Sequence, residues 1–184
     1  VTDPDAVEKV NKMADSVVEQ IDTIASVAMA FSQYAQLPEK NDEIFNLKNE
    51  VENIVRIFDD GDIFTHFNKD EIAIKMDRIY LNRILTNLIT NAKQATDATR
   101  KLIINIDVEQ IYKKITIKVQ DNGTGISDEI KERIFEPNFT SKSSGSGLGL
   151  TMVRKMIEDY KGEIVLNTEL GKGTTFIITL TTNL

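Results

Sequence analysis

A heptad pattern of apolar residues near the N-terminus restricts the possible folds of this chain more than any other feature. Two series between residues 7 and 35 alternate at spacings of three and four, and together they comprise Val7, Val10, Ala14, Val17, Ile21, Ile24, Ala28, Phe31 and Ala35. This spacing predicts a long helix that packs against other helices at a shallow crossing angle. Met13, Val27 and Tyr34 widen the apolar stripe, which favours a four-helix bundle over a two-stranded coiled coil. The alternative is a helix that lies on the core of its own chain.

Composition and charge exclude several classes of protein. The 184 residues contain no cysteine, so a disulfide scaffold and a cysteine-ligated metal site are excluded. A net charge of -7 opposes binding to nucleic acid or to an anionic membrane, because there is little counterion release to gain. No run approaches the roughly 20 apolar residues of a membrane-spanning helix, and the N-terminus has no signal-peptide pattern. We therefore expect a cytoplasmic chain without membrane contact. The chain can still be part of a longer parent protein that is anchored in the inner membrane.

The remainder of the chain has the pattern of a compact α+β domain. Helices are predicted at residues 46–60, 77–95, 128–135 and 148–160, the first capped by Asn46 and the second by Asp77. Strands are predicted at residues 63–67, 71–75, 102–108, 115–119, 163–168 and 174–180. Because the strands read as consecutive and antiparallel with helices between them, we expect one layer of helices on one face of a mixed, mostly antiparallel sheet. The chain is thus divided into a helical part, residues 1–40, and an α+β domain, residues 41–184.

Two asparagines on the second helix of this domain are candidate metal ligands. Asn87 and Asn91 are four residues apart, so their amides lie on one stripe of the helix, with Gln94 one turn later. A side-chain carbonyl oxygen suits Mg²⁺, which takes its other ligands from water and from the phosphates of a nucleotide. The alternative is that the two asparagines are only polar residues on the flank of the helix and bind no metal.

Asp121 follows a strand whose inward residues are Ile115, Ile117 and Val119, so by strand parity its carboxylate points to the core side. A buried carboxylate needs a hydrogen-bond donor, and the amino group of a bound base would supply one. Gly123 and Gly125 permit the close backbone approach that a planar ligand requires. The alternative is an Asx turn between strand and helix.

Residues 145–150 form a glycine-rich segment that leads into an amphipathic helix. Backbone amides at a helix N-terminus form a site for anions, whereas without other site residues the segment would be a flexible hinge. Thr174 lies on the same face of its strand as Phe176 and Ile178, so its hydroxyl also faces inward and can reach the pocket of Asp121.

The motifs occur in one order over about half of the chain. The asparagine pair is followed by Asp121-Asn122-Gly123-Thr124-Gly125, Ile134-Phe135-Glu136-Pro137 with Phe139, Gly145 to Leu150, and Gly171-Lys172-Gly173-Thr174. This order closely resembles the N, G1, F, G2 and G3 boxes of the catalytic and ATP-binding domain of sensor histidine kinases. That domain belongs to the GHKL superfamily of gyrase, heat-shock chaperone and mismatch-repair ATPases.

The resemblance extends over nearly the whole chain. Residues 1–38 resemble the second helix of the dimerisation and phosphoacceptor domain of these kinases, and the segments 31–35 and 137–142 resemble their nitrogen-regulation branch. The resemblance implies a two-layer α/β sandwich of the Bergerat type, preceded by a long dimerisation helix. It also implies a homodimer through residues 7–35 and, for the parent protein, transfer to the receiver domain of a response regulator.

Each site residue receives a role from the resemblance. The residues implied to contact ATP are Asn91, Asp121, Gly123, Gly125, Ile126, Lys142, Gly145, Gly147, Leu148, Gly149 and Thr174. Asn91 would coordinate Mg²⁺ with support from Asn87, and both would act in catalysis together with Lys142. Asp121 would accept a hydrogen bond from the adenine amino group, with Thr174 assisting through water.

The phosphates would be held by Lys142 and by the amides around Gly147, Leu148 and Gly149. Residues 136–146 would form a mobile lid over the nucleotide.

One departure from the family decides what we expect of this chain. No His-(Glu or Asp)-x-x-Asn-Pro-like segment is present, and the sole histidine, His66, lies in a predicted strand whose neighbours do not match that box. We therefore expect a kinase fragment that transfers the γ-phosphoryl group of ATP to a histidine outside this sequence and does not phosphorylate itself. The alternatives are a GHKL-type ATPase and a non-catalytic nucleotide-sensing dimer module. Against the ATPase, Asn87 stands where those relatives carry a water-activating glutamate.

Overall fold

A computed structural model describes most of the α+β domain and parts of the N-terminal segment. The described residues are 9, 12–14, 16–18, 20–21, 24–25, 40–58, 61–96, 100–137, 139–140, 147–182 and 184. Two residues with expected roles, Lys142 and Gly145, lie outside them, as does most of the predicted heptad helix.

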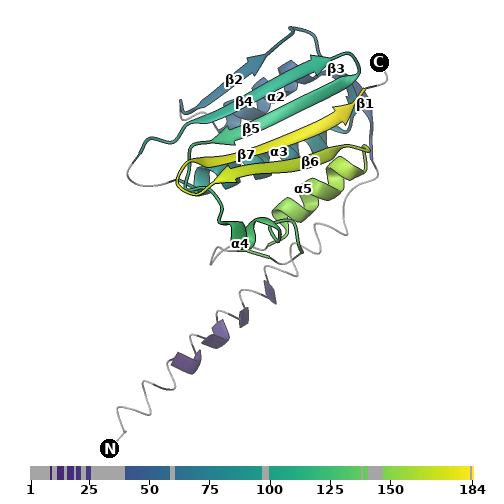
Figure 1. Cartoon of the computed structure of the whole chain (residues 1–184). Helices are drawn as coiled ribbons and strands as arrows, with labels where there is room; N and C mark the ends of the chain where they lie inside the picture. Colours follow the sequence, from purple (N-terminus) through teal and green to yellow (C-terminus); the bar gives the residue numbers. More distant parts are fainter. Residues whose placement is uncertain are drawn as a thin grey trace, which may run out of the picture.

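A five-stranded sheet forms one layer of the described domain (Figure 1). Its strands, in spatial order, are β2 (Ile63–Phe67), β4 (Ile104–Ile111), β5 (Lys114–Asp121), β7 (Gly173–Thr181) and β6 (Glu163–Glu169). The first pair, β2 and β4, is parallel, and the other neighbours are antiparallel. The expected mixed, mostly antiparallel sheet is therefore confirmed.

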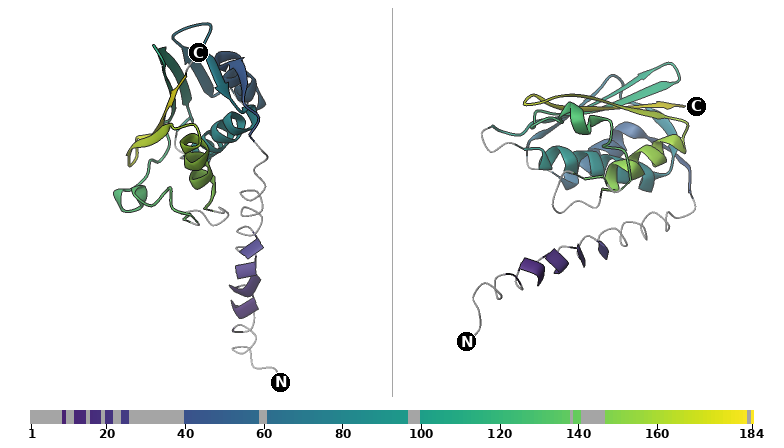
Figure 2. Two further views of the ribbon diagram at one scale, coloured as in Figure 1. Left: turned by 90° about the vertical axis from the view of Figure 1, so that its right-hand side faces the viewer. Right: turned by 60° about the horizontal axis from the view of Figure 1, so that its bottom comes forward.

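The second layer consists of helices on one face of this sheet, as expected. They are α2 (Leu47–Ile57), α3 (Arg78–Gln94) and α5 (Gly149–Glu158), with the one-turn helix α4 (Asp128–Lys131) beside α5. The right-hand view of Figure 2 shows the sheet edge-on above the helices. The core between the layers takes Leu85, Leu88 and Ile89 from α3 and every second residue of the strands, such as Ile104 and Ile117.

Side-chain caps begin two of the helices, as the sequence predicts. Asn46 accepts a hydrogen bond from the amide of Lys48 at 3.0 Å, and Asp77 accepts one from the amide of Ile79 at 2.7 Å. Helix α2 ends earlier than the predicted residue 60, because Phe58 takes the C-cap position and its amide bonds to the carbonyl of Val55.

A second, two-stranded sheet was not predicted. It pairs β1 (Glu43–Asn46) with β3 (Ala73–Met76) in antiparallel register, and Phe45 lies opposite Ile74. The predicted strand at 71–75 is therefore displaced by one or two residues, and β1 lies where no strand was predicted. Both strands are four residues long, so their pairing depends on burial of Phe45 and Ile74 and not on a local pattern. The predicted helix at 128–135 is likewise shorter, because turns follow Lys131.

A hydrogen-bonded cluster joins the segment before β1 to the helices. The hydroxyl of Tyr160 donates to Asp42 and accepts the amide proton of Asp77 at 2.8 Å. The second carboxylate oxygen of Asp77 accepts the amide of Asn41 at 2.8 Å. Burial and the hydrogen bond to Asp42 raise the pKa of the Tyr160 phenol well above its usual range. The N-terminal cap of α3 is thus tied both to α5 and to the entering chain.

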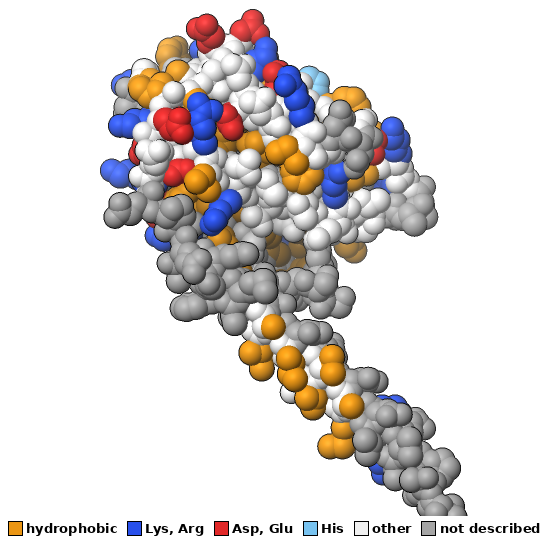
Figure 3. Space-filling view, turned by 180° about the vertical axis from the view of Figure 1, so that it is seen from behind, with side chains coloured by type: hydrophobic (Ala, Val, Ile, Leu, Met, Phe, Trp, Pro, Cys, Tyr) orange, Lys and Arg blue, Asp and Glu red, His pale blue; other side chains and the backbone are white. Residues whose placement is uncertain are grey.

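The described parts of the heptad segment are helical and expose their apolar side chains (Figure 3). Met13, Val17, Ile21 and Ile24 are each more than half exposed. No helix within the described residues has both the length and the apolar content needed to cross a bilayer.

Candidate functional site

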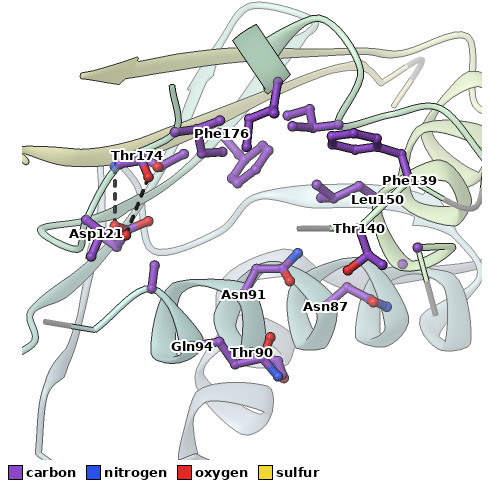
Figure 4. A pocket seen from close by; sticks show the side chains of 18 of the residues that line it. Asn87, Thr90, Asn91, Gln94, Asp121, Phe139, Thr140, Leu150, Thr174 and Phe176 are labelled. Carbon is purple, nitrogen blue, oxygen red and sulfur yellow. Dashed lines mark hydrogen bonds between the residues drawn. The ribbon is translucent and has the colours of Figure 1, made fainter. Parts of the chain in front are cut away.

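A cavity of about 420 Å³ lies between α3, the ends of β5 and β7, and the segment that leads into α5 (Figure 4). Its lining comprises Thr86, Asn87, Thr90, Asn91, Gln94, Ala95, Asp121, Thr124, Gly125, Ile126, Ile130, Ile134, Phe139, Thr140, Gly147, Gly149, Leu150, Thr174 and Phe176. Five segments of the chain therefore meet at one site: α3, the end of β5 with the turn after it, α4 with the residues that follow it, the start of α5, and the start of β7.

The asparagine pair lies on the face of α3 that borders the cavity, with the two amides about one helical turn apart (Figure 4). The amide nitrogen of Asn87 donates to the carbonyl oxygen of Arg83 at 2.8 Å. A Cβ atom built on Gly149 would lie 2.6 Å from the Oδ1 atom of Asn87. The glycine therefore allows the start of α5 to approach α3 closely, and the side-chain oxygen of Asn87 lies at this junction.

Asp121 is buried, with 5% of its surface exposed, at the end of β5. Its Oδ1 atom accepts the amide protons of Gly123 at 2.8 Å and of Thr174 at 3.2 Å. Two backbone donors on one oxygen fix the orientation of the carboxylate and offset part of the cost of burying its charge. The inward direction predicted from strand parity is confirmed, for Thr174 as well, which is 4% exposed.

The turn after Asp121 is held by close contacts that leave no room for a side chain at Gly123 or at Gly125. Gly125 has a φ angle of +70°, and a Cβ atom there would lie 2.2 Å from the carbonyl oxygen of Glu169. Gly123 faces Ala95, whose carbonyl oxygen would lie 2.5 Å from an added Cβ atom. The amide of Thr124 donates to that same carbonyl at 2.8 Å. Gly123 thus supports the turn from behind and is not part of the cavity lining.

Helix α5 begins at the cavity without a side-chain cap. Leu148 is its N-cap residue and makes no capping hydrogen bond through its side chain, and Gly147 and Gly149 line the cavity. The first turn of a helix has amides without an intrahelical acceptor, and its dipole favours negative charge. This end of the cavity therefore suits an anionic group.

The remaining wall is apolar and suits the flat faces of a planar group. Ile126, Ile130, Ile134, Phe139 and Phe176 come from the turn, from α4, from the segment after it and from β7. An apolar slot with a carboxylate at one end and uncapped helix amides at the other fits an elongated ligand that has a planar, donor-bearing head and an anionic tail.

Charge is sparse in this cavity. Among the described lining residues Asp121 is the only one with a charged side chain. Within the described residues no cluster of three or more acidic, histidine or cysteine side chains is arranged to hold a metal ion. A metal bound here would therefore take amide oxygens, water and ligand oxygens, a set that Mg²⁺ accepts.

The structure brings most of the predicted site residues together. Asn87, Asn91, Asp121, Gly125, Ile126, Gly147, Gly149 and Thr174 line the cavity. Thr86, Thr90 and Thr140 line it as well and were not predicted. Thr86 and Thr90 are four residues apart and form a second polar row on α3, each directly before one of the asparagines.

Comparison with known families gives one match. Residues 76–184 match the family described as histidine kinase-, DNA gyrase B-, and HSP90-like ATPase. All the described residues that line the cavity fall within this range.

Comparison with individual proteins adds relatives and solved structures. Nitrogen regulation protein NtrY of Azorhizobium caulinodans is 26% identical over 85% of this chain and 21% of its own length. The catalytic domain of histidine kinase ThkA superposes with a TM-score of 0.69 and 31% identity over 77% of this chain and 96% of that one. ThkA in complex with the response regulator protein TrrA gives a TM-score of 0.72 and 25% identity over 100% of this chain and 53% of that one. The chain spans about a quarter of the length of the curated relatives it matches.

Proposed function

Because the chain belongs to the family of histidine kinase-, DNA gyrase B- and HSP90-like ATPases, an ATP-binding family, we propose that it is the catalytic domain of a two-component sensor histidine kinase. The observation that carries this proposal is the likeness to the catalytic domain of ThkA over nearly all of that domain. The proposed reaction moves the γ-phosphoryl group of ATP to a histidine on another helix, from which it passes to an aspartate of a response regulator.

Adenine recognition is proposed for the end of the cavity at which Asp121 lies. The carboxylate of Asp121 would accept a hydrogen bond from the exocyclic amino group, and Thr174 would assist through water. Ile126 would pack against the base, and Gly123 and Gly125 would maintain the shape of the turn. The fixed carboxylate and the apolar walls support this assignment, since both match a flat base that bears an amino group.

Phosphate and metal binding is proposed for the opposite end. The uncapped amides around Gly147, Leu148 and Gly149 would hold phosphate oxygens, and Asn91 would coordinate Mg²⁺ with Asn87 in support. Bound Mg²⁺ would offset the negative charge that moves during phosphoryl transfer, so the protein mainly positions groups. Lys142 and Gly145, which lie outside the described residues, are proposed to contact the phosphates as well.

The chemistry of the lining favours transfer to a protein over hydrolysis. An ATPase needs a carboxylate near the attacking water, and the one carboxylate among the described lining residues, Asp121, lies at the proposed base end. Asn87, at the other end, has an amide, which is a poor general base. For this reason the kinase function is favoured over the ATPase alternative.

Phosphotransfer can be tested by supplying an acceptor. With labelled ATP we expect this chain to transfer phosphate to a separately made histidine-bearing dimerisation domain of its parent protein and to acquire no acid-labile phosphate itself. His66 is 3.3 Å from Asp107 on the solvent face of the sheet, whereas the cavity lies on the helix side. Label on His66, or release of inorganic phosphate without transfer, would contradict the proposal.

The metal role of Asn91 can be tested by comparing nucleotide affinity with and without Mg²⁺. Asn91→Ala is expected to weaken ADP binding about tenfold in Mg²⁺ and much less in EDTA, because only the metal-bound complex uses the amide oxygen. Asn105→Ala, the same chemical change on β4 away from the cavity lining, is the matched control and should change both values little. An equal loss with and without metal in Asn91→Ala would rule out the ligand role.

Assembly and location are proposed on the same basis. Homodimerisation through residues 7–35 is supported by the exposed apolar side chains of the described helical residues, which are costly to leave in water. We also propose a cytoplasmic location, where ATP and a response regulator would be available to the domain.

A further inference from the structure

Thr168, on the edge strand β6, is outside every motif discussed above, yet its hydroxyl contacts two of them. Its Oγ1 atom lies 2.9 Å from the amide nitrogen of Ile126, 3.0 Å from the carbonyl oxygen of Gly173 and 3.2 Å from the Oγ1 atom of Thr174. The register of β6 and β7 places Thr168 directly opposite Thr174. One hydroxyl therefore joins the turn after Asp121 to the strand that carries Thr174.

The three contacts determine which atom donates each hydrogen bond. A hydroxyl has one proton to donate and two lone pairs to accept with. Thr168 accepts from Ile126, because a backbone amide can only donate, and it donates to Gly173, because a carbonyl oxygen can only accept. Its remaining lone pair faces Thr174, so in the third contact the proton comes from Thr174.

This proton position determines what the hydroxyl oxygen of Thr174 offers to a ligand in the cavity. Since the proton of the Thr174 hydroxyl is directed to Thr168, the lone pairs of that oxygen remain for the cavity, which Thr174 lines. Asp121, whose carboxylate is held by the amide of Thr174, also presents acceptor character there. Two neighbouring acceptors suit an exocyclic amino group, which has two protons, and oppose a keto oxygen, which has none.

We infer that Thr168 is a positioning residue for base selection: it orients the hydroxyl of Thr174 as an acceptor and so favours 6-amino over 6-keto purines. This inference rests on the proposed function. It replaces the water-mediated contact of Thr174 by a direct one, since it assumes that the amino group of the base lies against both Asp121 and Thr174. Thr168 itself does not line the cavity, so it acts through Thr174 and through the position of Ile126.

The test compares ADP with inosine diphosphate, which differs in carrying a keto group and a ring N–H in place of the amino edge. Thr168→Val removes the hydroxyl with little change of volume, and Thr168→Ser retains it. We expect calorimetry to show that the ratio of ADP to IDP affinity falls about tenfold in the valine variant. In the serine variant the ratio should stay close to that of the unchanged chain. Thr174→Val should lower the ratio similarly. The double variant should have the same ratio as either single variant, because each change breaks the same contact between the two hydroxyls.

Controls separate this role from a structural one. Thr175→Val removes a hydroxyl from the opposite face of β7 and should leave the ratio unchanged. If Thr168→Val lowers the melting temperature while its ADP-to-IDP ratio equals that of the unchanged chain, the positioning role is wrong. If Thr168→Val does not fold, a lowered ratio in Thr168→Ser would contradict the inference, because that variant keeps the hydroxyl. Absence of ADP binding by the unchanged chain would instead overturn the proposed function and this inference with it.

Discussion

Asp121→Asn is expected to weaken ADP and ATP binding by about 5- to 150-fold while leaving the domain folded. The asparagine oxygen can still accept the amide protons of Gly123 and Thr174, so the turn retains its internal hydrogen bonds. Its NH₂ group then occupies the position of the other carboxylate oxygen and meets the adenine amino group, donor against donor. Such a buried mismatch costs about 1 to 3 kcal/mol, which corresponds to this range of affinity.

Calorimetry with ADP and a thermal melt of the same sample measure the two parts of this prediction. Asp107→Asn, which makes the same chemical change on the exposed face of the sheet, is the matched control and should bind normally. Unchanged ADP affinity in Asp121→Asn would remove adenine recognition from this residue.

The largest expected effect on stability comes from Gly173→Ala, at the first residue of β7. Gly173 has a φ angle of +117°, and a Cβ atom there would lie 2.0 Å from the carbonyl oxygen of Asp121. The strained backbone and the forced separation of β5 from β7 should together cost about 3 kcal/mol or more. The same substitution at Gly171 is a sharp control, since φ there is +80° but an added Cβ atom meets nothing within 4 Å.

Urea denaturation followed by circular dichroism should therefore show a loss of only about 1 kcal/mol for Gly171→Ala. Similar losses in the two variants would show that backbone conformation alone, and not the contact with Asp121, determines the cost.

The parts of the site that could be predicted follow from simple periodicities. Asp121 was placed inward because residues alternate along a strand, and Asn87 and Asn91 were placed on one stripe because a helix turns once in 3.6 residues. Asn46 and Asp77 were recognised as caps from residue type and position alone.

What could not be predicted depends on contacts between distant segments. Strand β1 exists because Phe45 packs against the core opposite Ile74, and four residues carry too little pattern to indicate it. Thr168 reads as an ordinary residue of an edge strand, and its importance appears only when Ile126, 42 residues away in sequence, is brought to its hydroxyl. The approach of Gly149 to Asn87 likewise requires the packed pair of α3 and α5.

The hydrogen-bonded cluster around Tyr160 joins segments that are far apart in the sequence, which affects the folding of the chain. Its bond to Asp42 spans 118 residues, and the bond of Asp77 to Asn41 spans 36. Contacts of such separation raise the mean contact order, and the entropy of closing the loop must be offset before they form. A chain shortened to begin at β1 would therefore lose the hydrogen bond between Tyr160 and Asp42, which has the largest sequence separation among the side-chain hydrogen bonds of the described residues. The cap of α3 would lose its hydrogen bond to Asn41 as well.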